Sequence, residues 1–459
     1  MRENTRQATL QSPSGEINDL EDVDWTFESV NTQNHTHGLH SYPARMVPQI
    51  AKTLLSYYKQ EGVIESGDQA YDPFSGSGTT AVEARLAGLH CETNDINPLA
   101  CLLTLAKARP LDLDLLSTGR QKLLDGLEPE LAEVRENYTA GTLEIEQPEV
   151  RDGWFPEPQL YELVAIRNRI NGLEQSLYTE TEASAESIKD LVRFFRVSLS
   201  STTRQVSYQR NGEYKRYRIP KEDREEHAPD VWNTFTSELE GDVEAMRSYS
   251  PTVDESLTTV THYADSRTAT DNGDESVEKD SADIVITSPP YGDHQTTVAY
   301  GQFSQDPGIV ADEYGYDEMK DVDKTGLGGA YSLERLEKLE QWSDSLAATL
   351  SALEKKDGRT EDALDFFTDY YAVMEQVAEI LKSGHPVAWV VANRTMSRVS
   401  IPTHLVTREL CEHLGFEHTH TLPREIPTKT LPWENAPENV PNQKGNLMAQ
   451  ENIVVMRSP

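Results

Sequence analysis

The tetrapeptide Ser288-Pro289-Pro290-Tyr291 directly follows a short apolar run in the segment DIVITSPPYGDHQ, residues 283–295. A proline ring fixes φ and removes the backbone N–H, so two consecutive prolines end a strand in a rigid loop with few competing donors. Such a loop can be plain strand termination, or it can be a rigid holder for a group on which the protein acts. Residues elsewhere in the chain decide between these two interpretations.

A second candidate motif, DPFSGSGTT at residues 72–80, joins a predicted strand to a predicted helix. Gly76 and Gly78 allow the backbone to approach a ligand closely, and the start of the helix offers free N–H groups to an anionic group. The motif differs from the fingerprint G-x-G-x-x-G because Thr79 and Thr80 occupy the region of the third glycine, which argues against a nicotinamide dinucleotide. Any tight strand-to-helix turn favours glycine, so this motif alone is weak support for a ligand site.

Two aspartates follow other predicted strands. Asp95 in ETNDINP stands where an acidic residue commonly accepts hydrogen bonds from ribose hydroxyls. It could equally cap the helix that starts near the next proline. Asp265 in HYADSR could accept a hydrogen bond from an adenine amino group, or it could serve a turn or a cap.

Apolar runs of strand length alternate with helical stretches, which is typical of a parallel sheet covered by helices on both faces. We expect an α/β fold with a doubly wound, mostly parallel, seven-stranded sheet. Ligands of such sheets bind beyond the carboxyl ends of the strands, so the motifs above should meet at one rim. The predicted strands are 68–74, 91–96, 257–265, 282–288, 386–393, 416–422 and 452–458.

Insertions divide this sheet domain. The stretch between the second and third strands lacks sheet-like runs and is predicted to be mainly helical, and a Gly- and acid-rich stretch follows the fourth strand. The predicted parts are a disordered polar tail (1–30), the first part of the catalytic domain (31–110), a helical insertion (111–255) and the second part of the catalytic domain (256–459) with its own insertion (306–362).

The chain of 459 residues carries 78 acidic and 42 basic side chains, a formal net charge of −36. Such an excess of acid usually opposes nucleic-acid binding, because phosphates are repelled. It is also typical of proteins from salt-saturated cytoplasms, where salt screens charge within roughly 3 Å at 1 M. We therefore expect a halophilic origin, in which the acidic surface says nothing about the ligand.

One segment, residues 193–224, is basic against this acidic background, and tyrosines lie between its cations. Interleaved cations and aromatic rings suit a phosphate-and-base surface, although most charge runs are solvated faces. The cations of this segment that would contact a nucleic acid, and DNA if the resemblance described below holds, are Arg204, Arg210, Lys215, Arg216 and Arg218. Arg394 is a further possible contact, and a plain surface arginine is an equal alternative.

Several classes of protein and site are not expected. No apolar run approaches the length of a membrane span, and the charged N-terminus lacks a secretory apolar region, so we expect a cytoplasmic protein. Cys91, Cys101 and Cys411 have no spacing for zinc or a disulfide framework, so we expect no metal.

The combination of DPFSGSGTT and the later TSPPY resembles S-adenosylmethionine-dependent DNA methyltransferases that modify exocyclic amino groups. The segment HGLHSYPARMVPQIAKTLL (37–55) resembles a helix of this family. The segments SPPYGDHQTTVAYGQFSQ (288–305), RDGWFPEPQLYELVAIRNRI (151–170) and IPTKTLPWENAPENVPNQKGNLMAQENIVVMR (426–457) are similar to one subgroup of modification methylases, so the resemblance covers most of residues 37–457. It implies the Rossmann-like class I methyltransferase fold and a helix that closes the methionine end of the cofactor.

The resemblance also implies roles for the residues that match its motifs. It places Ser288, Pro289, Pro290 and Tyr291 in the catalytic loop, with Asp95 at the ribose and Asp265 at the adenine. The other residues that it implies for cofactor binding are Tyr42, Pro43, Asp72, Pro73, Phe74, Gly76, Gly78, Thr79 and Thr80.

The residue types of the catalytic loop suit methyl transfer to an aromatic amino group. The lone pair of such a nitrogen is delocalised into the ring, and two acceptors near its hydrogens, the Ser288 hydroxyl and the Pro289 carbonyl, favour a pyramidal nitrogen that can attack. Tyr291 can stack on a base rotated out of the duplex, which this chemistry requires. Methylation of a ring carbon needs a Pro-Cys nucleophile, and no cysteine here follows a proline.

Members of the resembling family with serine first in this tetrapeptide mostly methylate cytosine N4, so we expect a site-specific cytosine-N4 methyltransferase acting on double-stranded DNA. It could be half of a restriction–modification pair with a cognate endonuclease. The alternatives are an adenine-N6 DNA methyltransferase, an RNA amino-methyltransferase, and an inactive cofactor-binding regulator. The last is disfavoured because the whole tetrapeptide is present.

Overall fold

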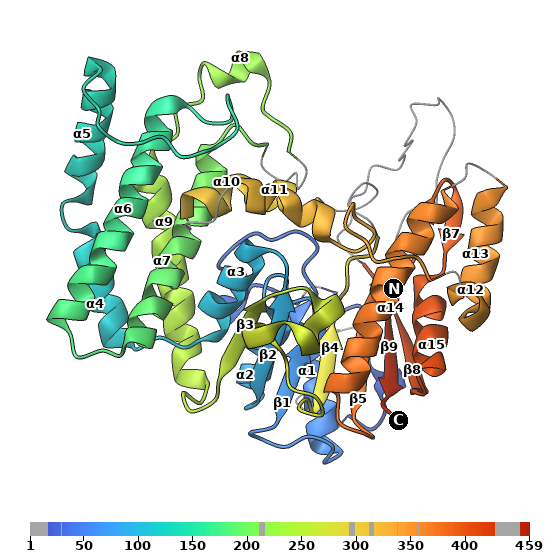
Figure 1. The fold of residues 1–459 in the computed structure, drawn as a ribbon. Coiled ribbons are helices and arrows are strands. Elements are labelled where there is room, and N and C mark those ends of the chain that lie inside the picture. Colours follow the sequence, from blue (N-terminus) through green and yellow to red (C-terminus); the bar gives the residue numbers. More distant parts are fainter. Residues whose placement is uncertain are drawn as a thin grey trace, which may run out of the picture.

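Residues 17–28, 30–210, 216–292, 299–311, 316–336, 338–355, 359–426 and 450–459 are described by a computed structural model of the chain. A central sheet lies between a group of helices from the middle of the chain and a group of C-terminal helices (Figure 1).

The central sheet has seven strands in the order β3-β2-β1-β4-β5-β9-β8. Neighbours from β3 to β5 pair in parallel, whereas β9 is antiparallel to both β5 and β8. The predicted α/β class and seven-stranded, mostly parallel sheet are therefore confirmed. The strands are β1 Gln69–Asp72, β2 His90–Asp95, β3 Thr259–Tyr263, β4 Ile284–Thr287, β5 Pro386–Ala392, β8 Glu417–Glu425 and β9 Gln450–Arg457.

Both faces of the sheet are buried, which explains why its central strands read as continuous apolar runs. On β4, Ile284 and Ile286 pack into one hydrophobic cluster while Val285 packs into another. The first cluster contains α1 Pro48–Gln60, α2 Thr79–Leu86 and α3 Pro98–Ala108, and the second contains α14 Thr360–Ile380 and α15 Thr403–His413. The chain also forms a small hairpin, β6 Arg394–Met396 and β7 Val399–Ile401, that the sequence did not predict.

The expected helical insertion consists of helices that stand beside the sheet (Figure 1). The Tyr249 hydroxyl donates to the carbonyl of Ala108 at 2.8 Å, which ties the last of them to the end of α3. They are α4 Leu113–Leu124, α5 Leu127–Ala140, α6 Glu157–Glu180, α7 Ala185–Val206, α8 Lys221–Arg224 and α9 Val231–Tyr249.

The second expected insertion returns over the rim of the sheet toward the first. Its helix α10 Tyr300–Ala311 packs against α7. It continues through α11 Tyr316–Thr325, α12 Leu339–Trp342 and α13 Asp344–Glu354.

Part of the segment expected to be a disordered tail is folded. Trp25 is only 3 % exposed, and its Nε1 donates to the carbonyl of Leu20 at 2.9 Å. Short 3₁₀ helices occur here at Leu20–Asp22 and His35–Gly38, and later at Ser250–Thr252, Ser266–Asp271 and Gly273–Glu275. Within the described ranges, no helix has the length and apolar character needed to cross a membrane.

Gly78 begins α2 with φ +78°, and a Cβ added there would lie 2.8 Å from the Cα of Thr104 on α3. We predict that Gly78→Ala lowers the free energy of unfolding by about 3 kcal/mol, because it combines left-handed backbone strain with a backbone clash. Gly62→Ala is the matched control, with φ +69° and open space around its Cβ, and should cost only about 1 kcal/mol. Urea unfolding of both variants measures the difference, and equal losses would contradict the role given to close packing of α2 on α3.

Candidate active site

A cavity open to solvent lies at the carboxyl ends of β1, β2, β3 and β4; the space in and in front of it amounts to about 1080 Å³. The parallel-sheet argument predicts this convergence, since the cavity collects residues that are far apart in the sequence. The predicted site residues that line it are Tyr42, Pro43, Asp72, Pro73, Phe74, Gly76, Thr79, Asp95, Asp265, Ser288 and Pro290. Gly78, Thr80, Pro289 and Tyr291 are not among its lining residues.

The buried carboxylate of Asp72 ties the end of β1 to the end of β4. Its Oδ1 accepts a hydrogen bond from Thr287 Oγ1 at 2.6 Å and another from the backbone N of Phe74 at 3.0 Å. Burial raises the pKa of Asp72 to about 6, and the hydrogen bonds only partly offset this rise. Asp72 therefore orders the loop after β1 as well as lining the cavity.

Asp95 joins the loop after β1 to the loop after β2. The backbone N of Gly76 donates to Asp95 Oδ2 at 2.9 Å, and that of Asn97 donates to Oδ1 at 2.8 Å. The cap of α3 is Asn97, whose side chain accepts from Leu99 N, so the capping role considered for Asp95 belongs to its neighbour. Each oxygen of Asp95 keeps a lone pair for a ligand hydroxyl. Burial raises the pKa of Asp95 to about 6.

Thr80 and Gly78 do not line the cavity, but both fix the position of helix α2 beside it. The hydroxyl of Thr80 donates to the carbonyl of Ile286 at 3.0 Å, which fastens α2 to β4. Gly78 provides the close approach of α2 to α3.

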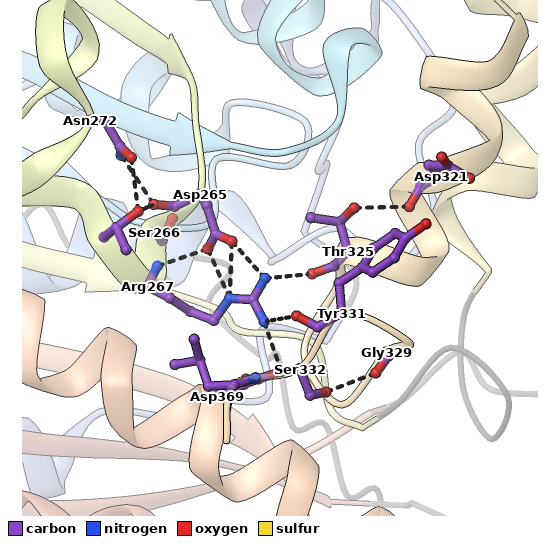
Figure 2. A network of polar contacts seen from close by, with 12 residues as sticks. Asp265, Ser266, Arg267, Asn272, Asp321, Thr325, Gly329, Tyr331, Ser332 and Asp369 are labelled. Atoms are coloured by element: carbon purple, nitrogen blue, oxygen red, sulfur yellow. Dashed lines mark hydrogen bonds and ion pairs between the residues drawn. The ribbon is translucent and has the colours of Figure 1, made fainter. Parts of the chain in front are cut away.

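Asp265 is both a cap and half of an ion pair (Figure 2). Its Oδ1 accepts from the backbone N of Arg267 at 2.9 Å, as a capping residue does. The Arg267 guanidinium also donates two hydrogen bonds to this carboxylate, one from Nε at 3.0 Å and one from Nη2 at 2.6 Å. The cap alternative is thus correct, and the carboxylate still lines the cavity.

Arg267 connects this end of the cavity to the segment 325–333. Its guanidinium donates to the carbonyls of Thr325 and Tyr331 (Figure 2), and the donor–acceptor distances are 3.1 Å and 3.2 Å. It also pairs with Asp369 on α14 at 3.0 Å, and Asp369 accepts from the backbone N–H groups of Gly328 and Leu333, each at 2.9 Å. Sequence reasoning missed Arg267, because its partners lie some 60 to 100 residues away.

In the loop after β4, Ser288 is partly buried and faces the cavity. Its hydroxyl donates to the carbonyl of Val390 at 3.2 Å and lies 3.4 Å from the hydroxyl of Tyr291. The Tyr291 hydroxyl in turn donates to Glu451 at 2.9 Å. The serine oxygen is therefore held at the cavity wall by neighbours on β5 and on its own loop.

The predicted cofactor residue Tyr42 forms an aromatic part of the cavity lining together with Tyr300, which the sequence analysis did not single out. Tyr300 on α10 lines the cavity and stacks on Tyr42, with ring centroids 5.9 Å apart. The side chain of Asn97 donates to the hydroxyls of Tyr42, at 2.9 Å, and Ser304, at 2.7 Å. The only sequence signal for Asn97 was its place two residues after Asp95.

The predicted DNA contacts separate into two groups. Arg210 and Arg218 are exposed. The side chain of Arg216 is only 5 % exposed, because it pairs with Asp306 on α10 and lies 4.1 Å from the ring centroid of Trp154. Arg204 lies over the Phe303 ring at 4.3 Å. Lys215 lies outside the described residues.

Arg394, considered as a surface residue, is instead 3 % exposed. Its guanidinium packs so closely on Gly292 that a Cβ there would lie 1.7 Å from Nη1. The alternative of a plain surface arginine is therefore wrong, and Arg394 packs against the loop after β4 at Gly292.

Replacing Arg267 with methionine should destabilise the protein, because Asp369 is fully buried and would lose its cation. We predict a loss of about 3 to 5 kcal/mol in the free energy of unfolding, as for other broken buried pairs. Arg335→Met is the matched control: its side chain is 41 % exposed in its pair with Asp365, and the loss should stay below about 1 kcal/mol. Urea unfolding at one fixed salt concentration tests this, and similar losses in both variants would contradict a structural role for Arg267.

No protein-family model matches the chain. It is 32% identical to the type II methyltransferase M.MvaI of Kocuria varians over 451 residues, covering 94% of this chain and 93% of the relative. It is 23% identical to the type II methyltransferase M.BsoBI of Geobacillus stearothermophilus, over 84% and 80% of the two chains. The solved rRNA methyltransferase AviRa of Streptomyces viridochromogenes is 11% identical over 91% of this chain and 88% of its own, with a TM-score of 0.28, and supports no argument. The near full-length match to M.MvaI shows that the chain belongs to the type II methyltransferase family.

Proposed function

We propose that the protein transfers a methyl group from S-adenosylmethionine to the N4 amino group of cytosine at a specific site in double-stranded DNA. The observation that carries the proposal is that one cavity is lined by Asp95, by the glycine loop and by Ser288. A cofactor and a target amino group could therefore meet in a single space. Membership of the type II methyltransferase family supports the reaction class.

The residues present fit the cofactor. Asp95 offers lone pairs to ribose hydroxyls, and the loop around Gly76 allows a close backbone approach. Asp265 fits the adenine amino group less well, because its oxygens already accept from the backbone and guanidinium of Arg267. When bound, S-adenosylmethionine supplies an electrophilic methyl group on a cationic sulfur.

The catalytic loop would bind the target base. Ser288 is suited to accept a hydrogen bond from the amino group, because its own hydrogen is directed to Val390. The Pro289 carbonyl would be the second acceptor, and Tyr291 would stack on the base once it leaves the duplex, although neither residue is among those that line the cavity. An uncharged serine, rather than a carboxylate, favours cytosine N4 through the family resemblance.

The exposed Arg210 and Arg218 are the proposed phosphate contacts on the insertion. Arg216 would instead help to join the two insertions, since it is buried against Asp306. Sequence-specific methylation would suit pairing with a restriction endonuclease. The net charge of −36 would suit a cytoplasm with high salt, in which DNA binding is less opposed by repulsion.

Incubation of unmethylated genomic DNA with the protein and S-adenosylmethionine, followed by digestion to nucleosides, tests the base. We predict N4-methylcytosine. Ser288→Ala should abolish it while binding of the cofactor, measured by calorimetry, survives, because Ser288 contacts the target and not the ribose. N6-methyladenine in place of N4-methylcytosine would overturn the choice of base, and loss of cofactor binding in Ser288→Ala would overturn its role.

Cofactor binding should depend on pH through Asp95. An ionised carboxylate accepts ribose hydroxyls better than a protonated one, and the pKa of Asp95 is raised to about 6. We predict that affinity strengthens as pH rises from 5 to 7, changing by up to about tenfold per unit below the pKa. Asp95→Asn should flatten this dependence, whereas Asp72→Asn should retain a slope because Asp72 orders the loop through Thr287 and Phe74. An unchanged slope in Asp95→Asn would show that another group is responsible.

A further inference from the structure

A carboxylate from the far end of the chain lies beside the catalytic loop. Because β9 runs antiparallel to β5, its first residues, and not its last, reach the rim where the parallel strands end. Glu451, the second residue of β9, is paired in register with Ala392 on β5 and with Arg424 on β8. Its side chain is only 12 % exposed.

Both oxygens of Glu451 are occupied by donors. Oε1 accepts from the Tyr291 hydroxyl at 2.9 Å, and Oε2 accepts from Nη1 of Arg424. Arg424 is itself fixed, because its Nε donates to the carbonyl of Trp25 at 3.1 Å and its side chain is 4 % exposed. Because the arginine side chain can only donate hydrogen bonds, the atom of Glu451 that faces Arg424 has to be an acceptor oxygen.

This arrangement determines the direction of the hydrogen bonds at Ser288. A carboxylate only accepts, so Tyr291 must donate its single hydroxyl hydrogen to Glu451. The Tyr291 oxygen, 3.4 Å from Ser288, can then only accept from the serine. The second polar neighbour of Ser288 within the described ranges, the carbonyl of Val390, is also an acceptor. The hydrogen of Ser288 is therefore drawn to one of these two, and its lone pairs are left for the cavity.

We propose that Glu451 is a positioning residue that makes the Ser288 hydroxyl a hydrogen-bond acceptor toward the target amino group, by forcing Tyr291 to act as a donor. This inference rests on the proposed function, since it concerns how the amino group is held. It assigns a role in the reaction to the start of β9 and to Arg424, which both lie outside the motifs near Ser288.

Glu451→Gln separates this role from simple packing. Arg424 would still require an acceptor, so the amide oxygen would face it and the amide NH₂ would face Tyr291. The tyrosine would then accept from the glutamine and direct its own hydrogen to Ser288, where it would occupy a lone pair needed by the substrate. Tyr291→Phe keeps the ring and removes the hydroxyl, and Ser288 can still donate to Val390.

The measurement is the single-turnover rate of tritiated methyl transfer to unmethylated genomic DNA, with cofactor affinity determined in parallel by calorimetry. We expect Glu451→Gln to lower the rate by about tenfold to a hundredfold, and Tyr291→Phe by less than about tenfold, with cofactor affinity unchanged in both. In the double variant, Glu451→Gln should have no further effect, because no tyrosine hydroxyl remains to be reversed. Glu417→Gln, at a carboxylate with 72 % side-chain exposure on β8, is the matched control and should leave the rate unchanged.

Equal loss factors for Glu451→Gln in the wild-type and Tyr291→Phe backgrounds would overturn the proposal, because packing alone would then explain the effect. An unchanged rate in Glu451→Gln would overturn it as well. If the wild-type protein transfers no methyl group to DNA, the proposed function fails and this inference fails with it. The first two outcomes leave the proposed function intact.

Discussion

The hydrogen bond of 2.6 Å between Thr287 and the buried Asp72 holds together the two loops on which the site depends. One loop follows β1 and carries Gly76, and the other follows β4 and carries Ser288. Without a tie at this point, the Gly76 side and the Ser288 side of the cavity could move independently. Because β1 and β4 are neighbours in the sheet, the tie spans 215 residues of sequence with one side-chain contact.

The two insertions meet beside this rim. Helix α10 packs on α7, and Arg216 pairs with Asp306 on α10. The basic segment therefore serves in part to join the two insertions. At the Asp265 end of the cavity, Arg267 plays the corresponding part by joining the loop after β3 to the segment 325–333 and to Asp369. The chain has a net charge of −36. Arg216 and Arg267 pair with the buried carboxylates of Asp306 and Asp369, which would otherwise be buried charges without a counter-ion.

The sheet was predictable because its strands are buried on both faces and therefore appear as apolar runs between helices. Asp95 and Ser288 were predictable as cavity residues because a parallel sheet collects its strand ends. The partners of Arg267, the burial of Arg216 and the contact of Glu451 with Tyr291 were not predictable, since each depends on packing between distant segments. Trp25 shows the same limit: a polar composition predicted a disordered tail, whereas one aromatic side chain packs into the core.

The central claim, that cofactor and target base meet in the cavity between the Gly76 loop and Ser288, is tested most directly by a crystal structure with S-adenosylhomocysteine and a duplex that contains the methylated site. The predicted result is a ribose on the Asp95 carboxylate and a cytosine, rotated out of the duplex, with its amino group at Ser288. A cofactor bound outside this cavity, or a target base held away from Ser288, would contradict the claim.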